Sequence, residues 1–153
     1  MKPGVLDSDV SAALYHQRLV ELANRIPEQK TCKQPFISIE KRAKSCGSTL
    51  TLQLNIDGGK IKDIGYTYET CLLTRAVLAV FCTAAIGKTR DEVHNIYILF
   101  KSWLRGGIDK LPEEWKELGI LAPAKDYQMR HKSMMMPFTA TLEAFDQRAS
   151  ITE

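Results

Sequence analysis

Residues 50–68 hold the pattern that most restricts how this chain can fold. Apolar side chains alternate strictly with polar ones in the first half of this segment, at Leu50, Leu52, Leu54 and Ile56. Such alternation predicts a strand with one buried face and one face in water. The residues that follow, Asp57-Gly58-Gly59, tolerate positive φ and predict a hairpin turn. We therefore expect an antiparallel hairpin whose apolar face other elements must cover.

The second strand of this hairpin carries apolar residues that do not share one parity. Ile64, Tyr66 and Tyr68 are in phase, and Ile61 is out of phase with them. One extra residue restores the alternation, so the sequence predicts a β-bulge near Lys62-Asp63. A weaker strand signal precedes the hairpin at residues 36–39. Together these segments predict a three-stranded antiparallel sheet.

The rest of the chain has helical periodicity. An amphipathic helix is expected from Asp7 or Ser8 to Ile26, and a helix that is apolar on all sides follows Thr70 and ends at Gly87. Thr89 and Glu92 match a capping box and open a helix that stops at residues 106–107. Shorter helical pieces are expected over 113–118 and 138–145, with another segment beginning at Pro123. This order predicts an α+β fold, a small antiparallel sheet with helices packed on one face.

Length and composition limit the class of protein. The 153 residues fit one domain over 1–153, in which we expect 1–8 to be flexible. Apolar residues make up 44% and charged residues 25%, as in ordinary globular domains. No apolar stretch is long enough to cross a membrane, and no signal core begins the chain, so we expect a cytoplasmic protein. A net charge of +3 is low for a nucleic-acid binder, and a solvated surface is favoured over a docking patch for the basic cluster of Lys41, Arg42 and Lys44.

Two of the four cysteines form a candidate site. Cys46 precedes the long strand, and Cys71 stands at the expected start of the buried helix. A hairpin returns the chain to its starting end, so the two thiols are expected to be neighbours; the alternative is two buried structural cysteines. Free N–H groups and the helix dipole favour the thiolate of Cys71, which predicts a lowered pKa.

Three further residues have a functional and a structural interpretation. Cys82 follows Cys71 by about 16 Å along the same helix, and a small buried apolar role is favoured for it. Cys32 is expected to be a bystander thiol. His131 lies in the polar segment 129–133, where its imidazole is either a metal ligand or a structural or solvated side chain.

Three motifs, in order, resemble the U-type iron–sulfur cluster assembly scaffolds: the NifU N-terminal domain, IscU and SufU. Cys46-Gly47 and the turn segment 57–63 (Asp-Gly-Gly-Lys-Ile-Lys-Asp) are similar to the family's first cysteine and hairpin. Cys71 and segment 84–89 (Ala-Ala-Ile-Gly-Lys-Thr) are similar to its second cysteine and the following helix. Segment 130–138 is similar to the region of its third cysteine, especially in the SufU branch. The resemblance spans nearly the whole chain and implies the same α+β fold.

The chain departs from the family pattern at three positions. Ser48 stands where the family has an aspartate, Ser133 where it has the third cysteine, and Lys132 where IscU-like members have a histidine. The resemblance therefore implies ligands at Cys46 and Cys71, with His131 as a substitute third ligand and Ser48, Lys132 and Ser133 as possible site-lining residues. Since a hydroxyl is a poor replacement for a thiolate, metal binding is expected to be weaker than in a full site, or absent.

The resemblance leads to several alternative functions. The first is a scaffold that binds iron or an iron–sulfur cluster and accepts sulfur at Cys71 or Cys46 from a cysteine desulfurase, before delivery to acceptor proteins. The second is a zinc-stabilised persulfide acceptor, and the third a metal-free protein that binds a desulfurase or another assembly partner. In all three the chain is not an enzyme. A thiol enzyme with Cys71 as nucleophile and His131 as base ranks last, because no third orienting group is evident.

Overall fold

The computed structural model describes residues 17–44 and 47–152. The expected helix start at Asp7 or Ser8, the flexible segment 1–8 and Cys46 lie outside the described residues. The first described helical residues are 17–23, after which the elements follow as β1 (Gln29–Lys30), β2 (Ile37–Ala43), β3 (Ser48–Asp57), β4 (Lys60–Glu69), α2 (Leu72–Ala84), α3 (Arg90–Leu104), the 3₁₀ helix η1 (Glu113–Asp126), α4 (Gln128–Met134) and α5 (Met136–Thr152).

The predicted hairpin is confirmed. β3 and β4 pair antiparallel, and the turn between them uses positive φ at Gly58 and Gly59. The register shifts where Asn55 pairs with Asp63 and Ile56 with Ile61, which leaves Lys62 as the extra residue of the predicted bulge. The bulge lets Ile61 be buried together with Ile64 and Tyr66.

The sheet has four strands in the order β1-β4-β3-β2, one more than expected. The additional strand, β1, is only two residues long and pairs with β4 through Gln29 opposite Thr67 and Lys30 opposite Tyr66. Two residues are too few to show a period-2 pattern, which is why the sequence did not predict this strand. The α+β class and the antiparallel sheet are confirmed.

The two long central helices agree with the prediction. α2 is mostly buried and ends before Gly87, which has φ +83°. α3 begins with the full capping box, since the Thr89 side chain accepts from Glu92 N–H and the Glu92 carboxylate accepts from Thr89 N–H. The boundary signals in the sequence therefore place both helices correctly.

The segment between α3 and α5 differs from the prediction. In place of a short piece over 113–118, η1 runs to Asp126 with Pro123 inside it, and α4 follows where a polar segment was expected. The 3₁₀ geometry accommodates the proline and has no 3.6-residue apolar stripe to recognise. α5 begins at Met136, with Pro137 in its first turn as predicted.

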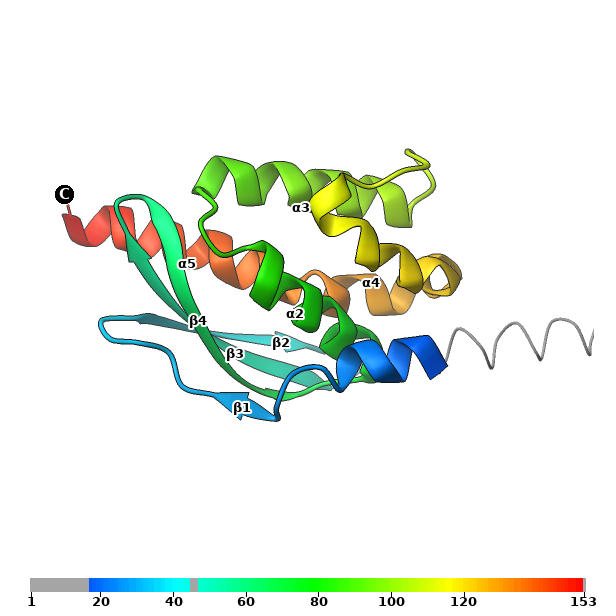
Figure 1. Ribbon diagram of the computed structural model, residues 1–153, viewed down its shortest axis with the longest axis horizontal. Coiled ribbons are helices and arrows are strands. Elements are labelled where there is room, and N and C mark those ends of the chain that lie inside the picture. The colour runs from blue at the N-terminus through cyan, green and yellow to red at the C-terminus, as the bar shows by residue number, and fades with distance from the viewer. Residues whose placement is uncertain (1–16, 45–46, 153) are drawn as a thin grey trace, which may run out of the picture.

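The helices lie on one side of the sheet (Figure 1). α5 packs across β2 and β3, α2 contacts η1, α4 and α5, and α3 packs on α5. The core between these layers is built from the buried faces of β2, β3 and β4 and from apolar side chains of all the helices. In the described part of the chain, no helix is long and apolar enough to cross a membrane.

Candidate functional site: the Cys71 thiol and its neighbours

Cys71 lies in the short connection between strand β4 of the hairpin and helix α2. It is the N-cap residue of this helix, in extended conformation, and its backbone N–H donates to the Ser48 hydroxyl at 3.4 Å. Ser48 is the first residue of β3 and is 2% exposed. The hairpin thus brings residue 48 back beside residue 71, as the sequence predicted for this end of the sheet.

Two hydroxyl groups surround the Cys71 sulfur. Its Sγ lies 3.5 Å from Thr74 Oγ1 and 4.0 Å from Ser133 Oγ, and the two hydroxyls hydrogen-bond each other. Thr74 is one helical turn after Cys71, and Ser133 comes from α4, so two helices meet at the thiol. Both hydroxyl residues are fully buried, whereas Cys71 is half-buried and accessible.

These contacts set the protonation of the thiol. Burial raises the pKa of Cys71, but hydrogen bonds from the Thr74 hydroxyl and backbone N–H, from the Arg130 side chain and from Ser133 together lower the pKa to about 7. A substantial fraction of the thiol is therefore thiolate at neutral pH, the form that attacks sulfur and binds metals. The lowered pKa expected from the helix N-terminus is present, and hydroxyl donors supply much of it.

The other described cysteines are inert by comparison. Burial raises the pKa of Cys82 to about 12, and burial together with the Asp63 carboxylate raises that of Cys32. Neither contacts the Cys71 site through any of the described hydrogen bonds. The sequence predicts a small buried apolar role for Cys82 and a bystander thiol at Cys32, and neither residue belongs to the described contacts of the Cys71 sulfur.

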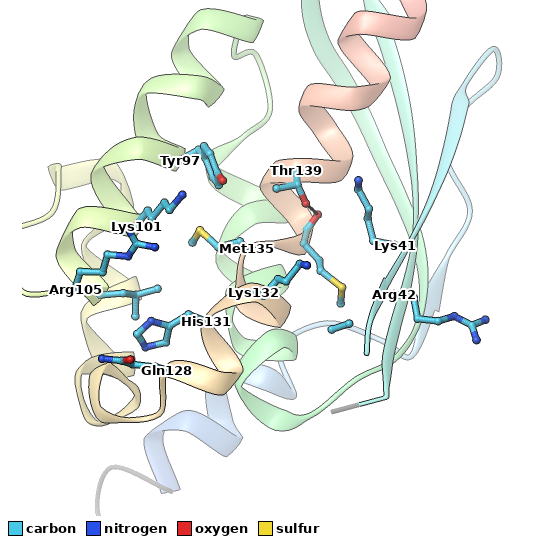
Figure 2. Close-up of a pocket in the computed structure, with 13 residues that line it drawn as sticks. Lys41, Arg42, Tyr97, Lys101, Arg105, Gln128, His131, Lys132, Met135 and Thr139 are labelled. Atoms are coloured by element: carbon cyan, nitrogen blue, oxygen red, sulfur yellow. Dashed lines mark hydrogen bonds between the residues drawn. The ribbon is translucent and has the colours of Figure 1, made fainter. Parts of the chain in front are cut away.

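His131 and Lys132 are not among the described hydrogen-bond partners of the Cys71 sulfur. His131 Nε2 lies 2.9 Å from the Ala124 carbonyl oxygen, and since a carbonyl only accepts, Nε2 carries the proton. Both residues line a cavity between α3, α4 and β2 (Figure 2). Two helical positions separate His131 from Ser133, which places them about 200° apart around α4. The structure therefore brings Ser48 and Ser133 to Cys71, while His131 and Lys132 lie on another face of the same helix.

Sequence reasoning missed Thr74 and Arg130. Thr74 is three residues after Cys71 in a predicted helix, and that spacing alone puts the two side chains on one face. Arg130 stands three residues before Ser133, the same spacing, but segment 129–133 was not recognised as helical. The helix assignment of this segment was the missing step.

The described residues alone do not make a metal centre. Residues 17–44 and 47–152 contain no group of three His, Cys, Asp or Glu side chains placed to hold a metal. Around Cys71 they supply one thiolate and three hydroxyls, and hydroxyl oxygens are weak ligands for iron, zinc or clusters. A soft-metal site at Cys71 would therefore need a further ligand from outside these ranges.

Comparison with known proteins finds iron–sulfur cluster assembly scaffolds among the proteins that this chain resembles. No protein-family profile matches the sequence. The chain is 24% identical over 113 residues to the iron–sulfur cluster assembly scaffold protein IscU of Streptococcus pyogenes, covering 74% of this chain and 71% of that protein. Among solved structures it is similar to the N-terminal NifU-like protein of Brucella abortus, with a TM-score of 0.78, 26% identity and coverage of 87% and 92% of the two chains. A candidate scaffold protein of the SUF system from Fervidobacterium islandicum has the same fold, with a TM-score of 0.70, 24% identity and coverage of 84% and 93%.

These likenesses agree with the family resemblance stated from the sequence and with the α+β arrangement of sheet and helices. The chain is thus related, in sequence and in fold, to the U-type iron–sulfur cluster assembly scaffolds of the IscU, SufU and NifU-like family.

Proposed function

We propose that this chain takes part in iron–sulfur cluster assembly as a scaffold or sulfur acceptor, with Cys71 as its central thiol. The observation that carries the proposal is the half-buried Cys71 sulfur, held partly as thiolate by Thr74 and Ser133. By the motif resemblance, Cys71 corresponds to the second cysteine of the scaffold family. As a scaffold the protein itself turns over no substrate, so it is not an enzyme, and its setting is the cytoplasm.

Sulfur transfer to Cys71 requires only a persulfide donor. The Cys71 thiolate attacks the outer sulfur of a cysteine persulfide on a desulfurase, forming a new S–S bond. The donor's S–S bond breaks, and its cysteine leaves as thiolate. No net oxidation occurs, and the hydrogen-bonded pair of hydroxyls, Thr74 and Ser133, can donate one hydrogen bond to the attacking sulfur throughout. The partners are therefore a cysteine desulfurase upstream and iron–sulfur acceptor proteins downstream.

Metal or cluster binding requires a second thiol. We propose Cys46 and Cys71 as ligands, because Cys46 is joined to Ser48 through one residue and chain geometry keeps their Cα atoms within about 8 Å. His131 joins this set only if α4 turns, since its ring now donates to Ala124. The neutral ring would then offer Nδ1 to iron, a cluster or zinc.

Metal content and anaerobic reconstitution test this proposal. Wild-type protein should hold zinc as purified, or acquire the visible charge-transfer bands of a cluster with iron and sulfide. Cys46→Ala and Cys71→Ala should lose either signal, and His131→Ala shows whether the imidazole contributes. Cys82→Ala is the matched control, because that thiol lies away from the site and should leave metal content unchanged. A colourless, metal-free wild-type protein would contradict metal binding.

The second candidate is a metal-free protein of the same fold that binds a desulfurase or another assembly partner. The two buried serines in place of an acidic and a thiol ligand, Ser48 and Ser133, favour it. In that case wild-type protein and both cysteine variants should bind the desulfurase equally well and contain no metal. Loss of binding in Cys71→Ala would contradict this alternative.

A further inference from the structure

A cavity of about 800 Å³ opens between β2, α3, α4 and α5, and its described lining residues do not include Cys71, Thr74 or Ser133. Its volume is within the range of about 300–1,000 Å³ typical of small-molecule sites. None of the described residues that line it is acidic.

Basic side chains surround the cavity from three elements. Figure 2 shows Lys41 from β2 on one side, Lys101 and Arg105 from α3 on the other, and Lys132 from α4 between them, while Arg42 points away. Lys41 is paired with Glu143 at 2.6 Å, so its charge is already neutralised. Within the described part of the chain, Lys101, Arg105 and Lys132 have no carboxylate partner. Three uncompensated positive charges thus face one hollow.

Apolar and aromatic side chains also line the cavity. They include Tyr97, Leu104 and Met135, and the Lys101 ammonium lies 5.7 Å from the centre of the Tyr97 ring. Such a lining favours a ligand with a hydrophobic or aromatic body, and the flexible methionine side chain can adapt to the ligand's shape. The positive charges and the apolar lining together favour a ligand with an anionic end and an apolar or aromatic end.

We propose that this cavity binds a phosphorylated organic anion, in which several phosphate oxygens contact Lys101, Arg105 and Lys132 and an aromatic or apolar body covers Tyr97 and Met135. Arginine and lysine are the side chains that proteins use for phosphate oxygens. The basic groups ring a hollow of small-molecule size rather than follow a line, so the geometry favours a compact polyanion over an extended acidic peptide. The proposal does not depend on metal at Cys71, because its principal basic groups lie on α3.

ATP without metal is the probe, and titration calorimetry on the full chain is the measurement. We expect saturable binding of one ATP, weaker binding of tripolyphosphate, which lacks the aromatic body, and the weakest binding of adenosine, which lacks the phosphates. Lys101→Gln and Arg105→Gln should each weaken ATP binding about tenfold, the loss of one charged hydrogen bond. Lys110→Gln makes the same charge change at an exposed residue outside the cavity and should leave the affinity within about twofold.

The proposal is wrong if ATP shows no saturable binding up to roughly 1 mM, where the binding free energy falls to about −4 kcal/mol. Equal affinities for ATP and tripolyphosphate, or an equal loss of affinity in Lys110→Gln, would also contradict it. Tighter binding of a glutamate-rich peptide than of ATP would favour an acidic protein segment as the ligand instead. Circular dichroism of each variant checks that the fold is retained. Cys71→Ala should bind ATP normally, so a failure of the metal proposal and a failure of this one give different results.

Discussion

Cys71 differs from Cys82 by its surroundings rather than by its depth alone. Cys71 caps α2 and Cys82 lies within it, but hydroxyl and backbone donors face Cys71, whereas burial leaves the charged form of Cys82 poorly solvated. The pKa is lowered to about 7 in the first case and raised to about 12 in the second. The same helix therefore holds a reactive and an unreactive thiol.

Alkylation should distinguish the two thiols by pH. In metal-free protein we expect the iodoacetamide labelling rate of Cys71 to rise with pH and to reach half its maximum near pH 7, because the thiolate replaces the thiol there. Thr74→Val removes the nearest hydroxyl donor at nearly constant volume and should move this midpoint upward, while Thr74→Ser should keep it low. A midpoint that is equal in all three proteins would contradict the role given to Thr74. Mass spectrometry of labelled peptides measures each site.

A cysteine in place of Ser133 would have its thiol at a suitable distance from Cys71 for both to bind one metal ion. Two thiolates bound to one tetrahedral zinc at about 2.3 Å lie roughly 3.8 Å apart. The distance from Cys71 Sγ to Ser133 Oγ is 4.0 Å. We expect Ser133→Cys to bind zinc at least tenfold more tightly than wild type, measured by chelator competition under reducing conditions. The control is Ser133→Cys combined with Cys71→Ser, which should return the affinity to the wild-type level or below; no gain in the single variant would show that this spacing does not serve a metal.

At the scale of elements, the β1 segment packs closely against β4 because Gly65 on β4 has no side chain. A Cβ added there would lie 2.5 Å from Cys32 N and 2.7 Å from Lys30 O. Both are backbone atoms, so the clash can be relieved only by moving the chain segment. We expect Gly65→Ala to separate the β1 segment from β4 and to lower the free energy of unfolding by about 1–3 kcal/mol. Hydrogen exchange at residues 29–30 and 66–67 should accelerate, and urea denaturation measures the stability.

Gly119→Ala is the matched control, because a Cβ at Gly119 meets no atom within 4 Å. This variant should change the free energy of unfolding by less than about 0.5 kcal/mol. Equal stability losses in the two variants would mean that the contact at Gly65 does not hold β1.

Elements defined by local chemistry could be predicted from the sequence, and those defined by their neighbours could not. The hairpin, its bulge at Lys62 and the capping box at Thr89 each depend on a few adjacent residues, and all three are present. β1 exists because β4 offers it a free edge, and η1 has no apolar period. The same limit applies to the site: Cys71 at a helix start was recognisable, but the direction of His131 depends on α4, which the pattern did not show.

For the whole molecule, the helical layer is organised around Phe138. Its ring lies 5.1 Å from that of Phe81 on α2, 5.7 Å from Trp115 on η1, and 5.8 Å from Phe100 on α3, centre to centre. Phe138 is fully buried and stands five residues after Ser133, at the start of α5. One side chain thus joins the helices that cover the sheet and anchors the segment that delivers Ser133 to Cys71.

Phe138→Ala should therefore affect both stability and the thiol. Removing the ring leaves a cavity among four helices, and we expect the free energy of unfolding to fall by about 3–5 kcal/mol in urea denaturation. Ile98→Ala removes an apolar side chain that is 47% exposed on α3, and it should cost less than about 1 kcal/mol. Because α4 loses its anchor in Phe138→Ala, the labelling midpoint of Cys71 should also move upward toward that of an ordinary thiol, whereas Ile98→Ala should leave it near 7. Helix α4 also contacts α2 and η1. A stability loss without any shift of the labelling midpoint would therefore show that these two contacts, rather than the aromatic cluster, hold Ser133 at Cys71.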